Sequence, residues 1–331
     1  MSLDYIDGMG DECTGTVSDL ALWGWTTTAN SIQSGRFGGG CMRLQNRTAT
    51  RSYAANARMT CGFAWRTDNA ANITQGLMEF RDTAGGVEHV RLTYNGNGTF
   101  TVSRAGTALA GGTTAVLSVL ANVWYYLELD VTIDDATGAF NLRFQGTSVC
   151  SNTGVDTRNG GNASTDNILL QHGASGAGDF DDLYLASGAT SFQGDTRVIT
   201  GLPTGDGGTV QWTPSTGVNH WAVVDENPEN GDTDYVSDAT GGDRDLYTYP
   251  ALGVTGTVIA VQTGAVARKD DAGARNLALV VKSGATTSDG TTQALAASYG
   301  GYTRIDTVDP NTAAAWTVAN VNAAQFGVKD V

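Results

Sequence analysis

The sequence has few basic residues, few prolines and no long apolar run. Asp and Glu together number 34 against 19 Lys and Arg, which gives a net charge of −15 at pH 7. A protein of this charge repels polyphosphate, so we expect no nucleic-acid partner. The chain nowhere approaches about eighteen consecutive apolar residues, so we expect no insertion into a membrane.

The four cysteines are too widely spaced for a metal-binding motif. Cys13, Cys41, Cys61 and Cys150 form no CxxC pair, which excludes the usual zinc patterns. The N-terminus shows no basic segment followed by an apolar run, and therefore no signal peptide. In a chain made in a reducing cytoplasm we expect four free thiols, although their even number leaves a disulfide open.

The chain is rich in glycine, with 44 residues, and along many segments its side chains alternate between apolar and polar. The alternation is clearest in residues 124–133, where one face is apolar and the other carries Glu and Asp. A turn leads from there to a second alternating run at 140–144, which predicts a hairpin. Residues 90–94 and 100–102 predict another hairpin through Asn-Gly-Asn-Gly.

The second half repeats this pattern after a stretch at 186–194 that reads as a short linker. The strands predicted beyond it are residues 196–202, 220–225, 246–249, 258–267, 276–282, 302–308 and 322–328. No convincing amphipathic helix interrupts them. The sequence therefore predicts an all-β fold of two antiparallel β-sandwich (jelly-roll) domains, residues 1–188 and 195–331, joined by a short linker.

Four segments of the first half also carry a family resemblance. Residues 5–9 (YIDGM), 35–44 (GRFGGGCMRL), 124–130 (WYYLELD) and 179–185 (DFDDLYL) together resemble the concanavalin A-like (LamG-like) jelly rolls of tailed-bacteriophage virion proteins. The second half, from residue 194 onward, is similar to the module that often follows this jelly roll in phage proteins. The resemblance implies a virion protein assembled in the host cytoplasm, and it brings no established catalytic residue.

On this resemblance we expect a non-enzymatic phage virion protein, of the tail or adsorption apparatus. Such a protein docks on other virion proteins of the tail or capsid, and we expect it to form a homo-oligomer that matches their symmetry. Two alternatives stay open: a capsid decoration protein, and an adsorption protein that binds or degrades a host surface glycan.

The candidate ligand-binding residues are two tryptophans. Trp23 and Trp25 lie two residues apart, so on a strand they would point to the same side. An exposed aromatic ring can stack on the apolar face of a pyranose. Packing in a core or a subunit contact is the competing interpretation.

The candidate metal ligands form the densest acidic cluster of the chain, which comprises Asp225, Glu226, Glu229, Asp232 and Asp234. Carboxylates at this spacing could hold calcium if the loop folds back on itself, although they do not match an EF-hand loop. Ordinary turn charges in solvent are the competing interpretation, and no other cofactor is expected.

Glycan hydrolysis requires two acidic groups across one cleft, and two carboxylate pairs in the sequence are candidates. Glu128 and Asp130 lie two residues apart, but Ile133 stands where a third acidic residue would complete the usual strand motif. Glu79 and Asp82 are a second pair. We expect all four to be solvated surface groups, and we therefore assign no catalytic residue.

Overall fold

Antiparallel strands make up nearly all of the regular structure. The computed structural model describes residues 2–10, 17–71, 73–188 and 192–331, so Cys13 lies outside the described residues. The chain divides into two units, Met1–Val198 (unit 1) and Ile199–Val331 (unit 2). The all-β prediction is confirmed, and no described helix is long and apolar enough to cross a membrane.

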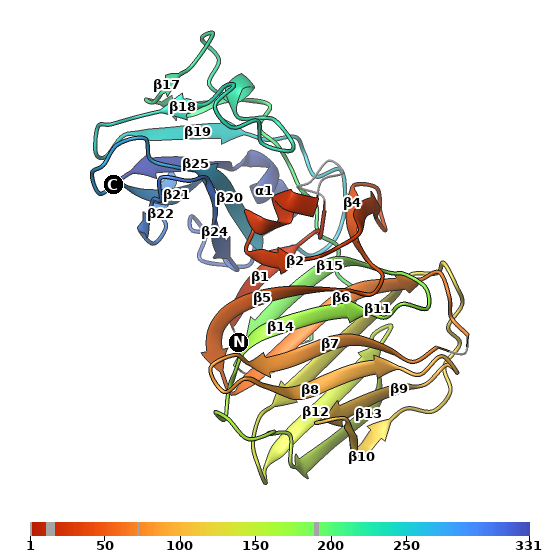
Figure 1. Cartoon of the computed structure of the whole chain (residues 1–331). Coiled ribbons are helices and arrows are strands. Elements are labelled where there is room, and N and C mark those ends of the chain that lie inside the picture. Colours follow the sequence, from red (N-terminus) through yellow and green to blue (C-terminus); the bar gives the residue numbers. More distant parts are fainter. Residues whose placement is uncertain (1, 11–16, 72, 189–191) are drawn as a thin grey trace. The chain divides into compact units, whose positions relative to one another are not determined.

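Unit 1 is a sandwich of two antiparallel sheets, seen as two layers in Figure 1. Sheet A follows the order β13-β12-β11-β6-β15-β4-β3, with β1 on β15, and sheet B follows the order β10-β9-β8-β7-β14-β5-β2. The strands of sheet A are β1 (Ser2–Asp7), β3 (Ser31–Ser34), β4 (Gly40–Leu44), β6 (Arg58–Thr67), β11 (Tyr125–Thr132), β12 (Gly138–Phe144), β13 (Thr147–Val155) and β15 (Gly178–Ser187). The strands of sheet B are β2 (Trp25–Thr27), β5 (Arg47–Asn56), β7 (Gln75–Asp82), β8 (Val87–Tyr94), β9 (Phe100–Arg104), β10 (Thr107–Thr113) and β14 (Thr165–His172), and a short 3-10 helix, η1 (Val17–Ala21), precedes β2.

Both hairpins predicted in the first half are confirmed. Strand β11 pairs with β12 from Leu127–Phe144 to Thr132–Ala139, and β8 pairs with β9. The apolar side chains of these strands meet between the sheets in one core, where the Trp65 and Tyr94 rings lie 5.3 Å apart. Burial of large rings of this kind is the main stabilising contribution of such a sandwich.

Unit 2 is built on one sheet with the order β16-β19-β25-β21-β22, and β23 also pairs with β21. Its strands are β16 (Gly205–Val210), β19 (Arg244–Thr248), β21 (Asn276–Ser283), β22 (Thr286–Asp289), β23 (Gln293–Ala294) and β25 (Gln325–Asp330). Two ribbons accompany it, β17 (Thr213–Pro214) with β18 (Val236–Ser237), and β20 (Val261–Ala267) with β24 (Gly300–Asp306). The helices are η2 (Trp221–Val223) and α1 (Val318–Ala323).

Two of the strands predicted for the second half are wrong. Residues 220–225 contain η2 instead of a strand, and the His220 ring that precedes it is held by Asp245, with 2.9 Å between Nδ1 and Oδ2. Residues 196–202 form no strand, and Thr196 and Val198 bind side chains of sheet A instead of the backbone of a neighbouring strand.

That binding segment, residues 192–198, is called the strap below. The backbone N–H of Gly194 donates to Glu128 Oε1 over 2.8 Å, and the N–H of Val198 donates to Asp182 Oδ1 over 2.8 Å. Asp195 accepts two hydrogen bonds from the Arg36 guanidinium. The end of the stretch predicted as a linker is therefore hydrogen-bonded to the outer face of sheet A, through Gly194.

The strap corrects the expectation that Glu128 and Asp130 are solvated. Glu128 is 1% exposed and also accepts a hydrogen bond from the Tyr184 hydroxyl over 2.6 Å. Asp130, 4% exposed, binds Thr60 Oγ1 and the Arg58 guanidinium. Glu128 therefore links β11 to β15 and to the strap, and Asp130 links β11 to β6.

Removing the Glu128 carboxylate should therefore weaken the fold. In Glu128→Ala, the Tyr184 hydroxyl and the Gly194 N–H both lose a buried acceptor, so the free energy of unfolding should fall by about 2–5 kcal/mol. Glu128→Gln keeps an oxygen at the Oε1 position and should lose less than half as much. Urea unfolding of the two variants measures the difference, and equal stability of both would contradict this role.

Candidate functional site

The outer face of sheet B is polar and is arranged in rows that run across the strands. Register and alternation place one side chain from each strand in the central row, because the flanking residues point into the core. This row, in order from β2 to β10, is Thr26, Thr50, Leu169, Glu79, Arg91, Ser103 and Ala108. At about 4.8 Å per strand, the row spans on the order of 29 Å.

Parallel rows on either side have the same character. One contains Thr93, Thr101 and Thr113, and the other contains Ser52, Asn167 and Arg81. Hydroxyl, amide and guanidinium groups thus cover most of this face, and together they offer both hydrogen-bond donors and acceptors.

A buried carboxylate lies at the centre of the face. Glu79 is 4% exposed, and its Oε1 accepts hydrogen bonds from Arg91 Nε over 2.9 Å and from Gln171 Nε2 over 2.6 Å. Gln171 reaches Glu79 across Gly76, where a Cβ atom would come within 2.6 Å of Gln171 Nε2. The expectation that Glu79 is a solvated group is therefore wrong. Its neighbours hold it in one orientation, as a binding site requires.

A second carboxylate, Glu88, shares the Arg91 guanidinium with Glu79. Burial raises the pKa of Glu88, and the nearby Glu79 charge raises this pKa further. Both carboxylates bind the same Arg91 nitrogen, so that guanidinium occupies the space between them. A glycosidase pair instead leaves that space open for the scissile bond. The pair consequently fits a role in holding Arg91 better than a role as acid and nucleophile.

The row ends beside a hollow of about 420 Å³ at the β9–β10 edge. The hollow is lined by Arg104, Ala105, Thr107, Ala108, Leu109, Ala110, Val155 and Asp156. Its polar wall is the ion pair between Arg104 and Asp156, and Arg104 Nη1 also donates to the carbonyl of Arg158 over 2.7 Å. Ala108 belongs to both the hollow and the central row.

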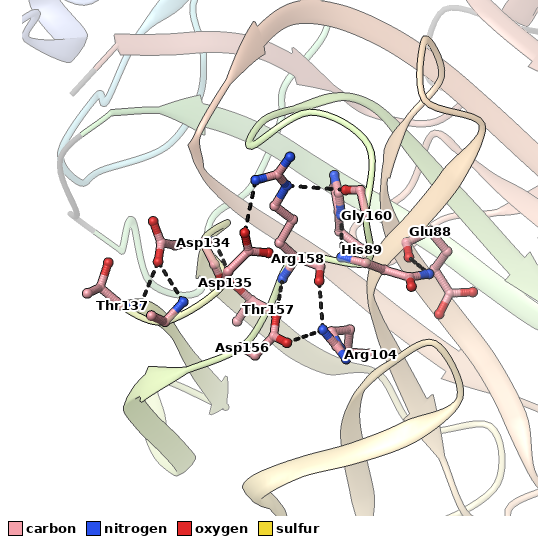
Figure 2. A network of polar contacts seen from close by, with 12 residues as sticks. Glu88, His89, Arg104, Asp134, Asp135, Thr137, Asp156, Thr157, Arg158 and Gly160 are labelled. Carbon is pink, nitrogen blue, oxygen red and sulfur yellow. Dashed lines mark hydrogen bonds and ion pairs between the residues drawn. The ribbon is translucent and has the colours of Figure 1, made fainter.

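Figure 2 shows how the loop beside this hollow is held. Arg158 binds Asp135 Oδ2 over 3.0 Å and the Gly160 carbonyl over 3.3 Å. The buried ring of His89 accepts a hydrogen bond from the Asn159 N–H at Nδ1, 3.0 Å, and lies with Nε2 3.2 Å from the Ser164 carbonyl. These contacts require the neutral ring with its proton on Nε2.

Asp82, the partner of Glu79 in the second candidate pair, is also a structural group. Its carboxylate is 2% exposed and accepts hydrogen bonds from the N–H groups of Gly85 and Asn162, over 2.9 and 2.6 Å. Burial alone would raise the pKa of Asp82, but these hydrogen bonds outweigh it and lower the pKa.

The two candidate tryptophans are not brought together as a stacking pair. Trp25 is 1% exposed, and its indole N–H donates to Asp7 Oδ2 over 2.7 Å. Its ring is part of the core and cannot stack on a sugar. Trp23 precedes β2 and is partly exposed, and its carbonyl accepts a hydrogen bond from Arg51.

The five candidate calcium ligands lie in unit 2, and three of them accept hydrogen bonds from different partners. Asp232 accepts hydrogen bonds from Arg268 and Tyr299, Asp234 accepts one from Asn230, and Glu229 accepts one from the Gly231 N–H. Asp225 and Asp234 lie near enough to Glu226 to raise its pKa further, although burial is the larger cause. Within the described ranges, no three His, Cys, Asp or Glu side chains are placed to hold a metal ion.

The described cysteines are free thiols in the core or at its margin. Cys41, Cys61 and Cys150 are all buried and unpaired. Burial raises the pKa of Cys150 to about 11 and that of Cys61 well above its usual value. These thiols are therefore protonated at neutral pH and unreactive.

Comparison with known proteins shows only the type of fold. The sequence matches no known protein family and no curated protein. Among solved structures, alginate lyase Aly36B superimposes with a TM-score of 0.44 at 11% identity, over 58% of this chain and 100% of that chain. The carbohydrate recognition domain of Emp46p gives 0.38 at 10% identity, over 55% and 97%. Trypanosoma rangeli sialidase gives 0.36 at 15% identity, over 49% and 28%.

These comparisons do not support the functional expectation drawn from the sequence. The predicted antiparallel β-sandwich is confirmed by the two sheets of unit 1. The expectation of a non-enzymatic phage virion protein finds no support in them, since they are a lyase, a sialidase and a carbohydrate recognition domain. All three TM-scores lie below 0.5, so these structures assign no function to this chain. The expectation that the chain is not an enzyme is likewise unsupported by these structures.

The buried histidines predict a dependence of stability on pH. Burial lowers the pKa of His89 and of His172 in the folded state. The unfolded chain therefore binds more protons, so stability is complete above the unfolded pKa of about 6.5 and falls as the pH drops below it. Urea unfolding should show a lower stability at about pH 5.5 than at about pH 7.5.

The variant His89→Gln isolates one of these groups. It keeps an amide that can meet both loop contacts and cannot take up the proton, so the loss of stability between the two pH values should be smaller than in the wild type. An unchanged pH dependence in this variant would show that His89 is not one of the groups responsible.

Proposed function

We propose that unit 1 recognises glycans on the outer face of sheet B. The observation that carries the proposal is the arrangement around Glu79: a buried, oriented carboxylate at the centre of a sheet face on which most other side chains carry hydroxyl, amide or guanidinium groups. Sugar hydroxyls both donate and accept hydrogen bonds, and a face with both kinds of partner in fixed rows meets that requirement.

The length and openness of the face favour a chain of sugars over a single one. Its central row crosses seven strands, from Thr26 on β2 to Ala108 on β10. The hollow beside Ala108 supplies a place where one end of an extended ligand could lie. This is the glycan-recognition alternative drawn from the sequence, now with a surface assigned to it.

Recognition on this face would rest on hydrogen bonds more than on stacking. The side chains of the three rows include no aromatic ring. Because each hydrogen bond to a ligand replaces one to water, its net contribution is about 0.5–1.5 kcal/mol. We therefore expect a dissociation constant between about 1 mM and 1 μM, equivalent to roughly −4 to −8 kcal/mol.

A substitution in the middle of the face tests the proposal. Thr93 on β8 is partly exposed, and Thr93→Arg should place a long side chain across the rows and weaken binding to any recognised polysaccharide at least tenfold. Thr147→Arg adds the same side chain at an exposed position on β13 of sheet A and should leave affinity unchanged. Affinity electrophoresis through gels that contain polysaccharides measures both.

The same samples should be assayed for shorter products and new chain ends. If fragments appear and Thr93→Arg abolishes them, the face is an active site as well as a binding surface. The proposal is rejected if the folded wild type binds no polysaccharide, or if Thr93→Arg and Thr147→Arg bind as the wild type does.

A further inference from the structure

One arginine on the outer face of sheet B, Arg81, has unused hydrogen-bond donors. Arg81 lies on β7 in register with Asn167 and Glu88, two residues from Glu79 and on the same side of the sheet. Across the described ranges, its guanidinium donates no hydrogen bond, and its one close ionic contact is 3.7 Å from Nε to Glu79 Oε2. Its side chain is 36% exposed.

Four other arginines on the outer faces of unit 1 bind carboxylates. Arg91 binds both Glu79 and Glu88. On sheet A, Arg43 and Arg66 both bind Asp179, and Arg58 binds Asp130. Arg81 differs from them because Glu79 Oε1 is already occupied by Arg91 and Gln171.

We propose that Arg81 binds a carboxylate of the glycan, and that the ligand of this face is therefore an acidic glycan containing uronic acid residues. This inference rests on the proposed function and names the class of ligand. A planar guanidinium with free N–H groups can bind a carboxylate through two parallel hydrogen bonds. Ser52, exposed in the same row, supplies a neutral group for an adjoining hydroxyl, and the buried Asn167 amide holds it through a hydrogen bond of 3.2 Å.

The overall charge of the protein makes this local contact necessary. A net charge of −15 repels an acidic polysaccharide at long range. A preference for the acidic form of a glycan must then come from a specific cation on the binding surface. Partial neutralisation of Arg81 by Glu79 at 3.7 Å weakens this attraction, but it leaves every N–H of the guanidinium available to a ligand.

The test uses the full chain and a panel of uronate polysaccharides, each paired with its carboxyl-reduced derivative, in which the carboxylate becomes a primary alcohol. The wild type should bind the acidic member of at least one pair at least tenfold more tightly than its neutral partner. Arg81→Gln keeps an amide donor but no charge, and it should lose the preference while binding to the neutral form stays within about twofold. Arg81→Lys should recover only part of it, because an ammonium lacks the two-pronged geometry.

Arg47→Gln is the matched control, since Arg47 is an exposed arginine on β5 whose Nη1 donates to the neighbouring Asn46 carbonyl. It should keep the full preference. Thermal unfolding verifies that each variant is folded. Equal binding of acidic and reduced forms by the wild type, or an unchanged preference in Arg81→Gln, would overturn the inference and leave the proposed function standing. Binding of neither form by the folded wild type would overturn both.

Discussion

A carboxylate taken out of water must be hydrogen-bonded, and both outer faces of unit 1 are organised around that requirement. On sheet A, Glu128 and Asp182 accept hydrogen bonds from the backbone of the strap. On sheet B, Glu79 is satisfied by Arg91 and Gln171 from the neighbouring strands. The first solution uses a segment of chain that covers the face. The second uses only side chains of the sheet itself and leaves the face open.

This difference gives the two sheets different roles. In sheet A, Arg43 of β4 and Arg66 of β6 both form ion pairs with Asp179 of β15. The strap adds a hydrogen bond to Glu128 on the same face. Such contacts fix the sandwich but leave few groups available to a ligand. Sheet B presents ordered polar rows in which Arg81 still has unused donors. A rigid face with unused hydrogen-bonding capacity is what a binding site requires.

Sequence patterns predicted the part of this structure that depends on neighbours along the chain. Alternation of side chains gave β11 with β12 and β8 with β9, because a period of two directly reports which side chains face the core. The same pattern could not show that Glu128 is buried. Its cover comes from Gly194, 66 residues away, and no periodicity reports such a contact. For Trp23 and Trp25, the two-residue spacing suggested one strand with both rings on the same side. Strand β2 begins only at Trp25, so the two tryptophans do not share a strand.

The central cluster of the candidate site was missed for a related reason. Glu79 meets Arg91 and Gln171 only through the register of β14, β7 and β8, which brings residues 92 positions apart into contact. The available signal was weak: polar residues at every second position of three separate strands. The most direct test of the account is a crystal structure of the chain with a bound oligosaccharide. We expect the sugar to lie on the outer face of sheet B within hydrogen-bonding distance of Arg81, and a sugar bound only to unit 2 or to sheet A would contradict it.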